Sequence, residues 1–395
     1  MSSISYLDAD EYSATENEDF LNKQIVTYIG NKRNLLNFIG NGLNKVRNRL
    51  SKNQLDIFDV FSGSGVVSRY FKKYSNRLIV NDLEIYSEAI NRCYLANRSE
   101  IDMNVLYDLY REITFKLENQ PLRAGFITDL YSPKNEERIL KDDRVFYTKR
   151  NAMYMDTARQ YIESIPGEYK DFFLAPLLSE ASIHANTSGV FKGFYKDSSK
   201  GVGKFGGNNG DALLRILGDI HIPFPVFSNF ECAVEIHRGD SNTIAECIRE
   251  VDVAYLDPPY NQHPYGSNYF MLNLISDYIR PDRISKVSGI PADWNRSNYN
   301  KRAKAKHSFR ELVQKLNAKF LLISFNSEGF ISSNEMVEIL QSIGEVEVLE
   351  TKYNTFRGSR NLRNRNIHVK EYLYLVEKKQ SCSKLQASSE ILLSL

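Results

Sequence analysis

Apolar and polar positions in the first third of the chain follow the pattern of a strand between two helices. Apolar side chains recur every three or four residues from Leu35 to Val46, which predicts a helix there. Residues 55–60 form a short apolar stretch typical of a buried strand, and a turn rich in glycine and serine follows at 61–65. Helical spacing then returns at 66–71. The order of strand, glycine-rich turn and helix is typical of an α/β sheet.

Further apolar stretches extend this unit. Residues 77–82 and 251–256 are short apolar segments that end in an acid or directly precede one. Strands are also predicted at 319–325, 345–350 and 372–377, the last two as an antiparallel pair at one edge of the sheet. Because strands alternate with helices, the sequence predicts a mostly parallel, Rossmann-like α/β sheet.

The alternation of strands and helices stops between residues 100 and 230, where helical patterns precede a stretch rich in glycine, lysine and phenylalanine. We predict that this segment is an inserted, largely helical domain. Residues 23–99 and 231–378 then make up the domain that contains the sheet. The acidic residues 1–22 are predicted to be a flexible leader, and residues 379–395 a serine-rich tail.

Composition excludes several classes of site. The 51 basic and 49 acidic residues give a formal net charge of only +2, so any nucleic-acid contact must come from local charge. Cys93, Cys232, Cys247 and Cys382 form no CxxC pair, and the histidines lack ligand spacing, so neither a metal site nor a disulfide framework is predicted. The acidic amino terminus is unlike a signal peptide, and no apolar run could span a membrane. We therefore expect a soluble intracellular protein.

Acids stand at three predicted strand ends, beside the glycine-rich turn. They are Asp59, Asp82 and Asp257. Ligands of an open α/β sheet bind at the carboxyl ends of its strands, and Gly63 and Gly65 let the backbone approach a ligand closely. The GxGxxG spacing and a Walker lysine are both missing, which disfavours a dinucleotide or a triphosphate. Asp82 is suited to a ribose diol, and capping the next helix is the alternative role for it.

The strongest chemical signal is Asp257-Pro258-Pro259-Tyr260, directly after an apolar strand. Two prolines fix the backbone and remove two N–H groups. The Asp257 carboxylate and a nearby carbonyl can then act as two acceptors beside the ring of Tyr260. This arrangement matches the exocyclic amine of a flat base, whose nitrogen lone pair it would localise for attack on an electrophilic methyl group. The alternative interpretation is a rigid turn between strand and loop.

With these residues in place, the chain resembles the Dam-type DNA adenine N6-methyltransferases over most of residues 23–378. The order of motifs is that of their alpha group. Tyr28-Ile-Gly-Asn-Lys-Arg33 resembles the amino-terminal cofactor segment, which implies that Tyr28, Gly30 and Lys32 contact the methionine end of S-adenosylmethionine. The other implied cofactor contacts are Asp59, Phe61, Gly63, Gly65, Asp82, Asp240, Ser241 and Asp257.

The resemblance further implies that Asp257, Pro258, Pro259 and Tyr260 are catalytic and that the substrate is a flipped-out adenine in double-stranded DNA. The insert at 100–230 matches by position only, so we predict a target-recognition role without a recognition sequence. Asn186, Thr187 and Arg150 are candidate base readers, and His263 a candidate contact to the substrate backbone.

Three basic stretches, each interleaved with aromatic residues, suit contacts to phosphates. Residues 296–310 carry six lysines and arginines and no acid, residues 352–370 do the same, and a run of lysines lies in the insert. The predicted DNA contacts are Lys192, Lys196, Arg296, Lys301, Arg302, Arg357 and Arg360.

Three other functions stay open from the sequence. They are methylation of an amino group in structured RNA, methylation of cytosine N4, and DNA binding without catalysis on a methyltransferase fold. The resemblance places the protein in bacterial restriction–modification, in the cytoplasm at the nucleoid, with a cognate restriction endonuclease as a possible partner. A monomer is expected, because methylating one strand at a time needs one site.

Overall fold

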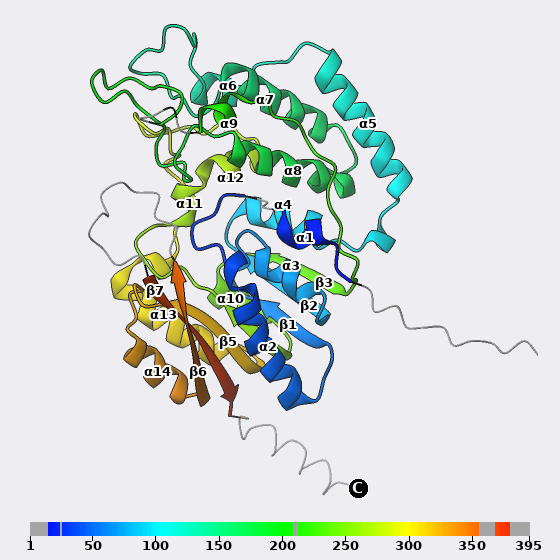
Figure 1. The fold of residues 1–395 in the computed structure, drawn as a ribbon, viewed down its shortest axis with the longest axis vertical. Coiled ribbons are helices and arrows are strands. Elements are labelled where there is room, and N and C mark those ends of the chain that lie inside the picture. The colour runs from blue at the N-terminus through cyan, green and yellow to red at the C-terminus, as the bar shows by residue number, and fades with distance from the viewer. Residues whose placement is uncertain (1–14, 24–25, 208–209, 211, 355–367, 380–395) are drawn as a thin grey trace, which may run out of the picture.

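A seven-stranded sheet lies at the centre of the lower half of the protein in Figure 1, in the order β3-β2-β1-β4-β5-β7-β6. The computed structural model describes residues 15–23, 26–207, 210, 212–354 and 368–379. The strands are β1 (Leu55–Asp59), β2 (Ser75–Asp82), β3 (Ala233–Arg238), β4 (Val251–Leu256), β5 (Ala318–Asn326), β6 (Gly344–Asn354) and β7 (His368–Lys378). The strand β7 runs in the opposite direction to the other six, since it pairs antiparallel with both β5 and β6 and the remaining pairs are parallel. The predicted Rossmann-like α/β class is confirmed.

Alternation along each strand explains why the sheet is covered on both faces. In β1, Ile57 points into a cluster with the apolar side of α2, whereas Phe58 points into a cluster with α13. The same division recurs in β5, where Leu321 and Leu322 belong to opposite clusters. A strand buried on both faces reads as a continuous apolar run, which is why the sequence identified these strands.

Helices cover the two faces. One face carries α2 (Leu36–Leu50) and α3 (Val66–Lys72), and the other carries α10 (Ser241–Cys247), α13 (Arg302–Lys315) and α14 (Ser333–Gln341). Short 3-10 helices occur at Arg33–Leu35 (η1), Arg98–Glu100 (η2), Gly167–Tyr169 (η3) and Asn298–Asn300 (η4).

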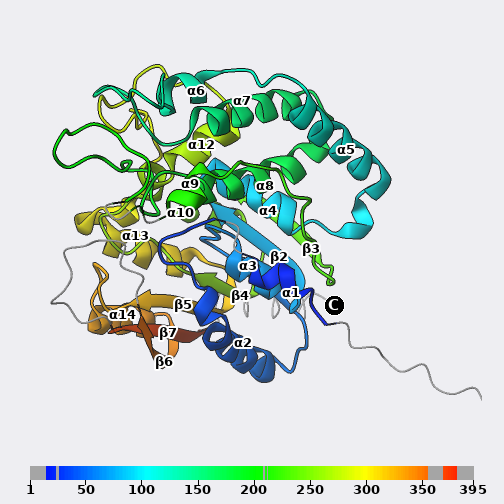
Figure 2. The same cartoon turned by 45° about the horizontal axis from the view of Figure 1, so that its top comes forward.

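A helical layer lies above the sheet in Figures 1 and 2 and has its own hydrophobic core. It contains α4 (Ile85–Tyr94), α5 (Met103–Asn119), α6 (Phe126–Tyr131), α7 (Lys149–Glu163), α8 (Lys170–Ile183), α9 (Leu213–Leu217), α11 (Tyr265–Asn268) and α12 (Phe270–Asp277). Residues of α12, such as Phe270, pack with residues of α8 from the segment predicted to be an insert. The chain therefore enters this layer again directly after the Asp-Pro-Pro-Tyr segment. No helix in the described part of the chain is long and apolar enough to cross a membrane.

The end of the segment predicted to be a leader packs against the rest of the protein. It forms α1 (Glu18–Asn22), whose Phe20 side chain is fully buried. The Arg69 guanidinium donates a hydrogen bond of 2.6 Å to the Phe20 carbonyl oxygen. Residues 1–14, which are most of the predicted leader, and residues 380–395, which are most of the predicted tail, lie outside the described residues.

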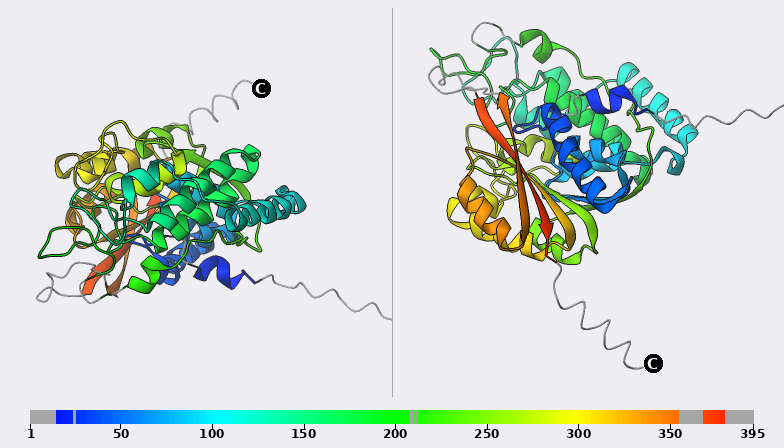
Figure 3. Two further views of the ribbon diagram at one scale, coloured as in Figure 1. Left: turned by 90° about the horizontal axis from the view of Figure 1, so that it is seen from above. Right: turned by 60° about the horizontal axis from the view of Figure 1, so that its bottom comes forward.

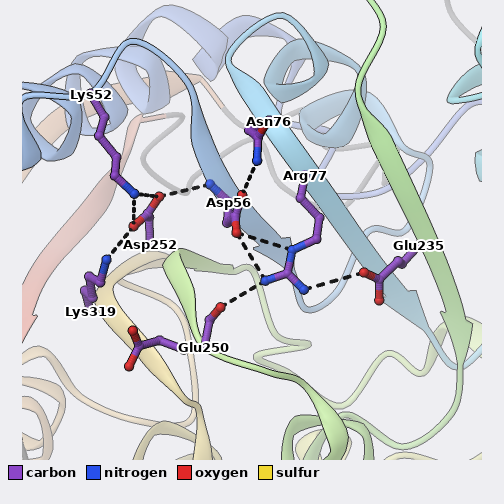
Figure 4. Close-up of polar contacts among 8 residues, drawn as sticks. All are labelled: Lys52, Asp56, Asn76, Arg77, Glu235, Glu250, Asp252 and Lys319. Atoms are coloured by element: carbon purple, nitrogen blue, oxygen red, sulfur yellow. Dashed lines mark hydrogen bonds and ion pairs between the residues drawn. The ribbon is translucent and has the colours of Figure 1, made fainter.

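The amino-terminal ends of the strands, opposite the predicted site, are held by a network of charged side chains (Figure 4). Asp252 of β4, whose side chain is only 4% exposed, pairs with Lys52 at 2.8 Å and Lys319 at 2.9 Å. It also accepts a hydrogen bond from the backbone N–H of Asp56 in β1. Asp252 therefore ties together β1, β4 and β5 at one end of the sheet.

Candidate active site

A pocket of about 890 Å³ opens at the carboxyl ends of the parallel strands. It lies where β1 and β4 run side by side, between the turn after β1 and the loop after β4. The strand order proceeds to β2 on one side of β1 and to β5 on the other side of β4, so this is the topological switch point of the sheet. The fold thus brings the glycine-rich turn and the Asp-Pro-Pro-Tyr segment together.

Most predicted cofactor residues line this pocket. They are Tyr28, Gly30, Lys32, Asp59, Phe61, Gly63, Asp82, Asp240, Ser241 and Asp257, and Pro259 joins them. Gly65, Pro258 and Tyr260 are not among the lining residues. Gly65 instead precedes α3 with a φ of +73°, and a side chain there would collide with the Asn91 amide oxygen at 2.8 Å.

Asp82 organises the glycine-rich turn. Its carboxylate accepts one hydrogen bond of 2.8 Å from the N–H of Gly63 and another of 2.9 Å from the N–H of Glu84. Gly63 has a φ of +53°, and a Cβ atom at this position would lie 3.1 Å from the Tyr28 ring. The turn therefore requires glycine here. Asp82 therefore joins the ends of β1 and β2 and does not serve only the helix that follows. Burial raises the pKa of its carboxyl group.

Stacked tyrosines fix the segment that contains Tyr28. The Tyr28 ring packs against both Tyr265 and Tyr269, with centroid separations of 4.9 and 4.7 Å and interplanar angles of 17° to both, and these two rings are themselves 5.9 Å apart. Tyr265 donates a hydrogen bond to the Ile29 carbonyl oxygen, and the Ile29 N–H donates to the Tyr269 hydroxyl at 2.7 Å. The loop after the Asp-Pro-Pro-Tyr segment therefore holds one wall of the pocket.

Three residues of the pocket lining have a buried side-chain oxygen without a hydrogen-bond partner among the described residues. These oxygens are Oδ1 of Asp59, Oδ1 of Asn81 and the hydroxyl of Tyr255, and the first two can act only as acceptors. Ser68 donates a hydrogen bond of 2.6 Å to Oδ2 of Asp59, and the Asn81 amide nitrogen donates to the carbonyls of Val60 and Gly239. A buried acceptor without a donor is costly, so both oxygens are suited to donors on a ligand.

Burial raises the pKa of Asp59 to about 7, with nearby Asp257 and Asp82 adding to the shift. The folded protein then binds a proton here more tightly than the unfolded chain, so this group's contribution to stability falls as pH rises toward 7. We expect the wild-type protein to lose stability from pH 5 to pH 8 and the Asp59→Asn variant to lose less. Thermal unfolding of both proteins without ligand at the two pH values measures this. Equal losses in both proteins would contradict this.

Asp257 lies in a row of three charged side chains. The Lys32 ammonium is 3.1 Å from the Asp257 carboxylate and 3.0 Å from the carboxylate of Glu371 on β7. Lys32 is 5% exposed and Asp257 is 20% exposed, at the pocket lining. Burial raises the pKa of Asp257 to about 6, Lys32 opposes this rise, and Glu371 adds to it. The carboxylate is therefore ionised at neutral pH and more basic than an exposed one.

Tyr260 is fixed beside this row. Its carbonyl oxygen accepts a hydrogen bond of 2.9 Å from the N–H of Phe330, and its ring meets Phe325 edge to face with centroids 5.9 Å apart. The Lys32 nitrogen lies 6.0 Å from the centroid of the Tyr260 ring. The aromatic face and the Asp257 carboxylate thus belong to one rigid unit at the rim of the pocket.

The far wall is built around α10. The Asp240 carboxylate accepts hydrogen bonds from the N–H groups of Asn242 and Thr243 and so caps this helix. Phe61 meets Tyr299 edge to face at 5.2 Å.

Several residues that line the pocket were not predicted from the sequence. Glu84 is 3% exposed, accepts hydrogen bonds from Asn273 and Asn295, and has its pKa raised to about 7 by burial. Its position two residues after Asp82 was the available signal. Tyr265 and Asn300 also line the pocket, but only the fold brings them there.

The predicted DNA contacts lie on loops and on one helix end. Lys192 and Lys196 are exposed, and Arg296 lies over the Trp294 ring at 4.3 Å. Arg302 is the first residue of α13, and Lys301 directly precedes it. Arg357 and Arg360 lie outside the described residues.

Of the candidate base readers, Asn186 is fully buried and donates hydrogen bonds to the carbonyl oxygens of Val145 and Lys204, so it is a scaffold residue and that prediction is wrong. Arg150 pairs with Asp219 at 2.6 Å. His263 is exposed in the loop after the Asp-Pro-Pro-Tyr segment.

Comparison with known proteins identifies the family of the chain. The family model of the D12 class N6 adenine-specific DNA methyltransferases matches residues 28–206 and 226–339, well over half of the chain. The chain belongs to this family. Both the predicted resemblance and the assignment as an adenine-specific DNA methyltransferase are confirmed at this level.

Curated relatives of this D12 methyltransferase are modification enzymes. The chain is 29% identical over 362 residues to the type II methyltransferase M.NlaIII of Neisseria lactamica, covering 89% of this chain and 99% of the relative. It is 28% identical over 360 residues to M.CviAII of Paramecium bursaria Chlorella virus 1, covering 89% and 98%. It also matches M.FokI of Planomicrobium okeanokoites at 27% identity over 365 residues, covering 89% of this chain but 52% of that relative. Membership of this family disfavours the RNA and N4-cytosine alternatives.

Proposed function

We propose that the protein transfers a methyl group from S-adenosylmethionine to N6 of a flipped-out adenine at a specific site in double-stranded DNA. The observation that carries the proposal is the position of Asp257 on the lining of a pocket closed by the glycine-rich turn. A carboxylate there is placed to accept a hydrogen bond from a base amine next to a bound methyl donor. Extruding the base from the duplex costs a few kcal/mol.

The pocket fits S-adenosylmethionine. Its lining joins the glycine-rich turn, the acid at the end of β2 and the Asp-Pro-Pro-Tyr segment around one space. The backbone at Gly63 leaves space that a side chain would fill, and Asp59 and Asn81, which also line the pocket, each have a buried acceptor oxygen without a partner among the described residues. In this proposal Asp82 holds the ribose, Asp240 and Ser241 lie at the adenine end, and Tyr28, Gly30 and Asp59 lie at the methionine end.

The cofactor supplies a methyl group on a sulfonium sulfur, which departs as a neutral thioether. Asp257 accepts one hydrogen bond from the adenine amine and a carbonyl of the proline pair, such as that of Pro258, accepts the other. These acceptors draw the amine toward tetrahedral geometry and make its lone pair available, while Tyr260 stacks on the base. Positioning and electrostatics thus supply most of the rate enhancement.

Basic side chains near the pocket suit the DNA backbone. Lys301 and Arg302 stand at the amino end of α13, where the helix dipole disfavours positive charge, and no acid stands in the first turn. A phosphate at this position would relieve the repulsion.

A second, polar hollow of about 710 Å³ lies beside Thr27 and is lined by Thr187, Tyr195 and Arg215 among others. Among the described residues no carboxylate lines it, so it is our candidate for base or phosphate contacts from the segment at 100–230.

We expect the double substitution Lys192→Ala, Lys196→Ala to weaken DNA binding and to reduce the slope of log affinity against log salt by about 2, because each lost phosphate contact removes roughly one released counterion. Fluorescence anisotropy at several salt concentrations measures this, and calorimetry should show unchanged cofactor binding.

The matched control for that pair is Arg111→Ala, Lys116→Ala on α5, at the other end of the helical layer from the loop around Lys196 (Figure 1). Loss of cofactor binding in the Lys192 and Lys196 variant would indicate misfolding, and unchanged DNA affinity would contradict the assignment.

The relatives named type II methyltransferases support a role in restriction–modification, with a cognate endonuclease as partner. We propose that the enzyme acts as a monomer in the bacterial cytoplasm at the nucleoid. The test is incubation of unmethylated bacterial DNA with the protein and S-adenosylmethionine, followed by long-read sequencing. Modified adenine at one short motif supports the proposal, and modification without sequence preference contradicts site specificity. No modification while the cofactor still binds would indicate a non-catalytic DNA-binding protein.

A further inference from the structure

Glu371 is a buried carboxylate next to the catalytic segment, and no sequence motif includes it. It stands near the start of β7, opposite Asn326 of β5, and is 3% exposed. β7 is the red strand in the right view of Figure 3. Because β7 runs antiparallel to β5 and β4 runs parallel to β5, the beginning of β7 lies at the same end of the sheet as the end of β4, which Asp257 follows. A buried carboxylate costs stability unless it is paired, so its partners indicate its role.

The partners of Glu371 are Lys32 and Ser324. The Lys32 ammonium is 3.0 Å from Oε1 of Glu371, and the Ser324 hydroxyl donates to the same oxygen at 3.2 Å. The same ammonium is 3.1 Å from Asp257. Lys32 therefore has two competing carboxylates, and the three ionised groups together carry one net negative charge.

The charge on this row matters for methyl transfer. During transfer the bond from sulfur to the methyl carbon breaks and the bond from N6 to that carbon forms, so one positive charge moves from sulfur to N6. One N6 proton then leaves to solvent. An Asp257 carboxylate neutralised by its own lysine would be a weak acceptor for the amine and would offer little stabilisation to the positive charge that reaches N6.

We infer that Glu371 is a positioning residue for the reaction: it holds Lys32 between two carboxylates and so keeps Asp257 available as an acceptor, in a row with net negative charge. Lys32 in turn fixes the orientation of Asp257. This inference rests on the proposed methyl transfer and adds to it a residue outside the Asp-Pro-Pro-Tyr segment.

The inference predicts the direction of a pH shift. In the part of the chain that the structure describes, the other titratable groups around Asp257 are Lys32 from the loop before η1, Glu371 from β7, Asp59 from β1, and Tyr255, Tyr260 and Tyr265. Glu371 raises the pKa of Asp257 and Lys32 lowers it. Removing the charge of Glu371 should lower the pKa of Asp257, and removing that of Lys32 should raise it.

The test compares Glu371→Gln with the wild-type enzyme across pH. We expect kcat for DNA methylation to fall by roughly 10- to 100-fold with little change in either KM, because electrostatic stabilisation of the transition state is lost. We also expect the acidic limb of the kcat profile to move to lower pH, whereas Lys32→Met should move it to higher pH. Ser324→Ala keeps all charges, so its acidic limb should stay in place.

A matched control lies on the same strand. Glu377 lies near the other end of β7, is half-exposed and pairs with Arg49 of α2. Glu377→Gln therefore removes an equal charge away from the pocket and should leave kcat unchanged. Wild-type kcat and an unmoved acidic limb in Glu371→Gln would overturn the inference. A raised KM for the cofactor with unchanged kcat would also overturn it, since Glu371 would then act in binding.

A second readout does not need catalysis. In protein labelled with 13C-aspartate, the Asp257 carboxyl signal is identified by its loss in Asp257→Asn and then titrated without cofactor. A lower midpoint in Glu371→Gln supports the inference, and an unchanged midpoint overturns it. If wild-type protein methylates no DNA, the proposed function fails while this titration still tests the coupling.

Discussion

Replacing Asp257 by asparagine should lower kcat for DNA methylation by on the order of 100- to 1,000-fold, the usual cost of removing one preorganised electrostatic contact to a transition state. The substitution keeps the shape of the side chain but removes the negative charge. It also leaves the Lys32 ammonium without one of its two carboxylates. Because Asp82 and the turn at Gly63 are untouched, the fold of the cofactor pocket should persist.

Single-turnover assays measure the loss directly, and calorimetry measures cofactor affinity in parallel. The matched control is Asp277→Asn, an exposed position at the end of α12, which should behave as wild type. An Asp257→Asn enzyme with more than about a tenth of the wild-type kcat would contradict the assigned role, since a drop below tenfold is worth less than 1.4 kcal/mol.

Replacing Asp252 by alanine should have the largest effect on stability, lowering the free energy of unfolding by about 1–3 kcal/mol. Asp252 joins β1, β4 and β5 through Lys52, Lys319 and the N–H of Asp56 (Figure 4). Alanine would leave this partly buried N–H without its acceptor and would remove the partner of both lysines. Urea titration measures the loss, and Asp282→Ala, an exposed position, serves as the control.

The stabilisation should also depend on pH. The lysines and the Asp56 N–H hold the pKa of Asp252 below its ordinary value, against the opposing effect of burial. A carboxyl group with a lowered folded pKa stabilises the protein above its unfolded pKa, and this benefit is lost as pH falls through the folded value. The difference between wild type and Asp252→Ala should therefore shrink below about pH 4. A difference that is constant from pH 7 to pH 3 would contradict the charge-based account.

The central strands could be predicted because each is buried on both faces, and a short, uninterrupted apolar run between turn residues is typical of such a strand. The edge strand β3 was missed for the opposite reason. Its sequence, Ala233–Arg238, alternates exposed and half-buried positions and contains Glu235 and Arg238, so no apolar run marks it. Edge strands are defined by a neighbour's hydrogen bonds more than by their own side chains.

The residues of the site also fall into those that the sequence marks and those that only the fold brings together. Gly63, Asp82 and Asp257 were found because strand ends and local motifs mark them. Glu371 was missed because its role depends on a contact with Lys32, which lies in a different part of the chain and comes close only when β7 inserts beside β5. Asn186, in contrast, shows that a polar residue in a recognition segment can serve only the scaffold.

The most direct test of the account is mass spectrometry of nucleosides after incubation of the protein with S-adenosylmethionine and either unmethylated DNA or cellular RNA. The account predicts N6-methyl-2′-deoxyadenosine from DNA, absent with Asp257→Asn, and no methylated product from RNA. N4-methylcytosine in DNA, or methylation of RNA alone, would contradict it.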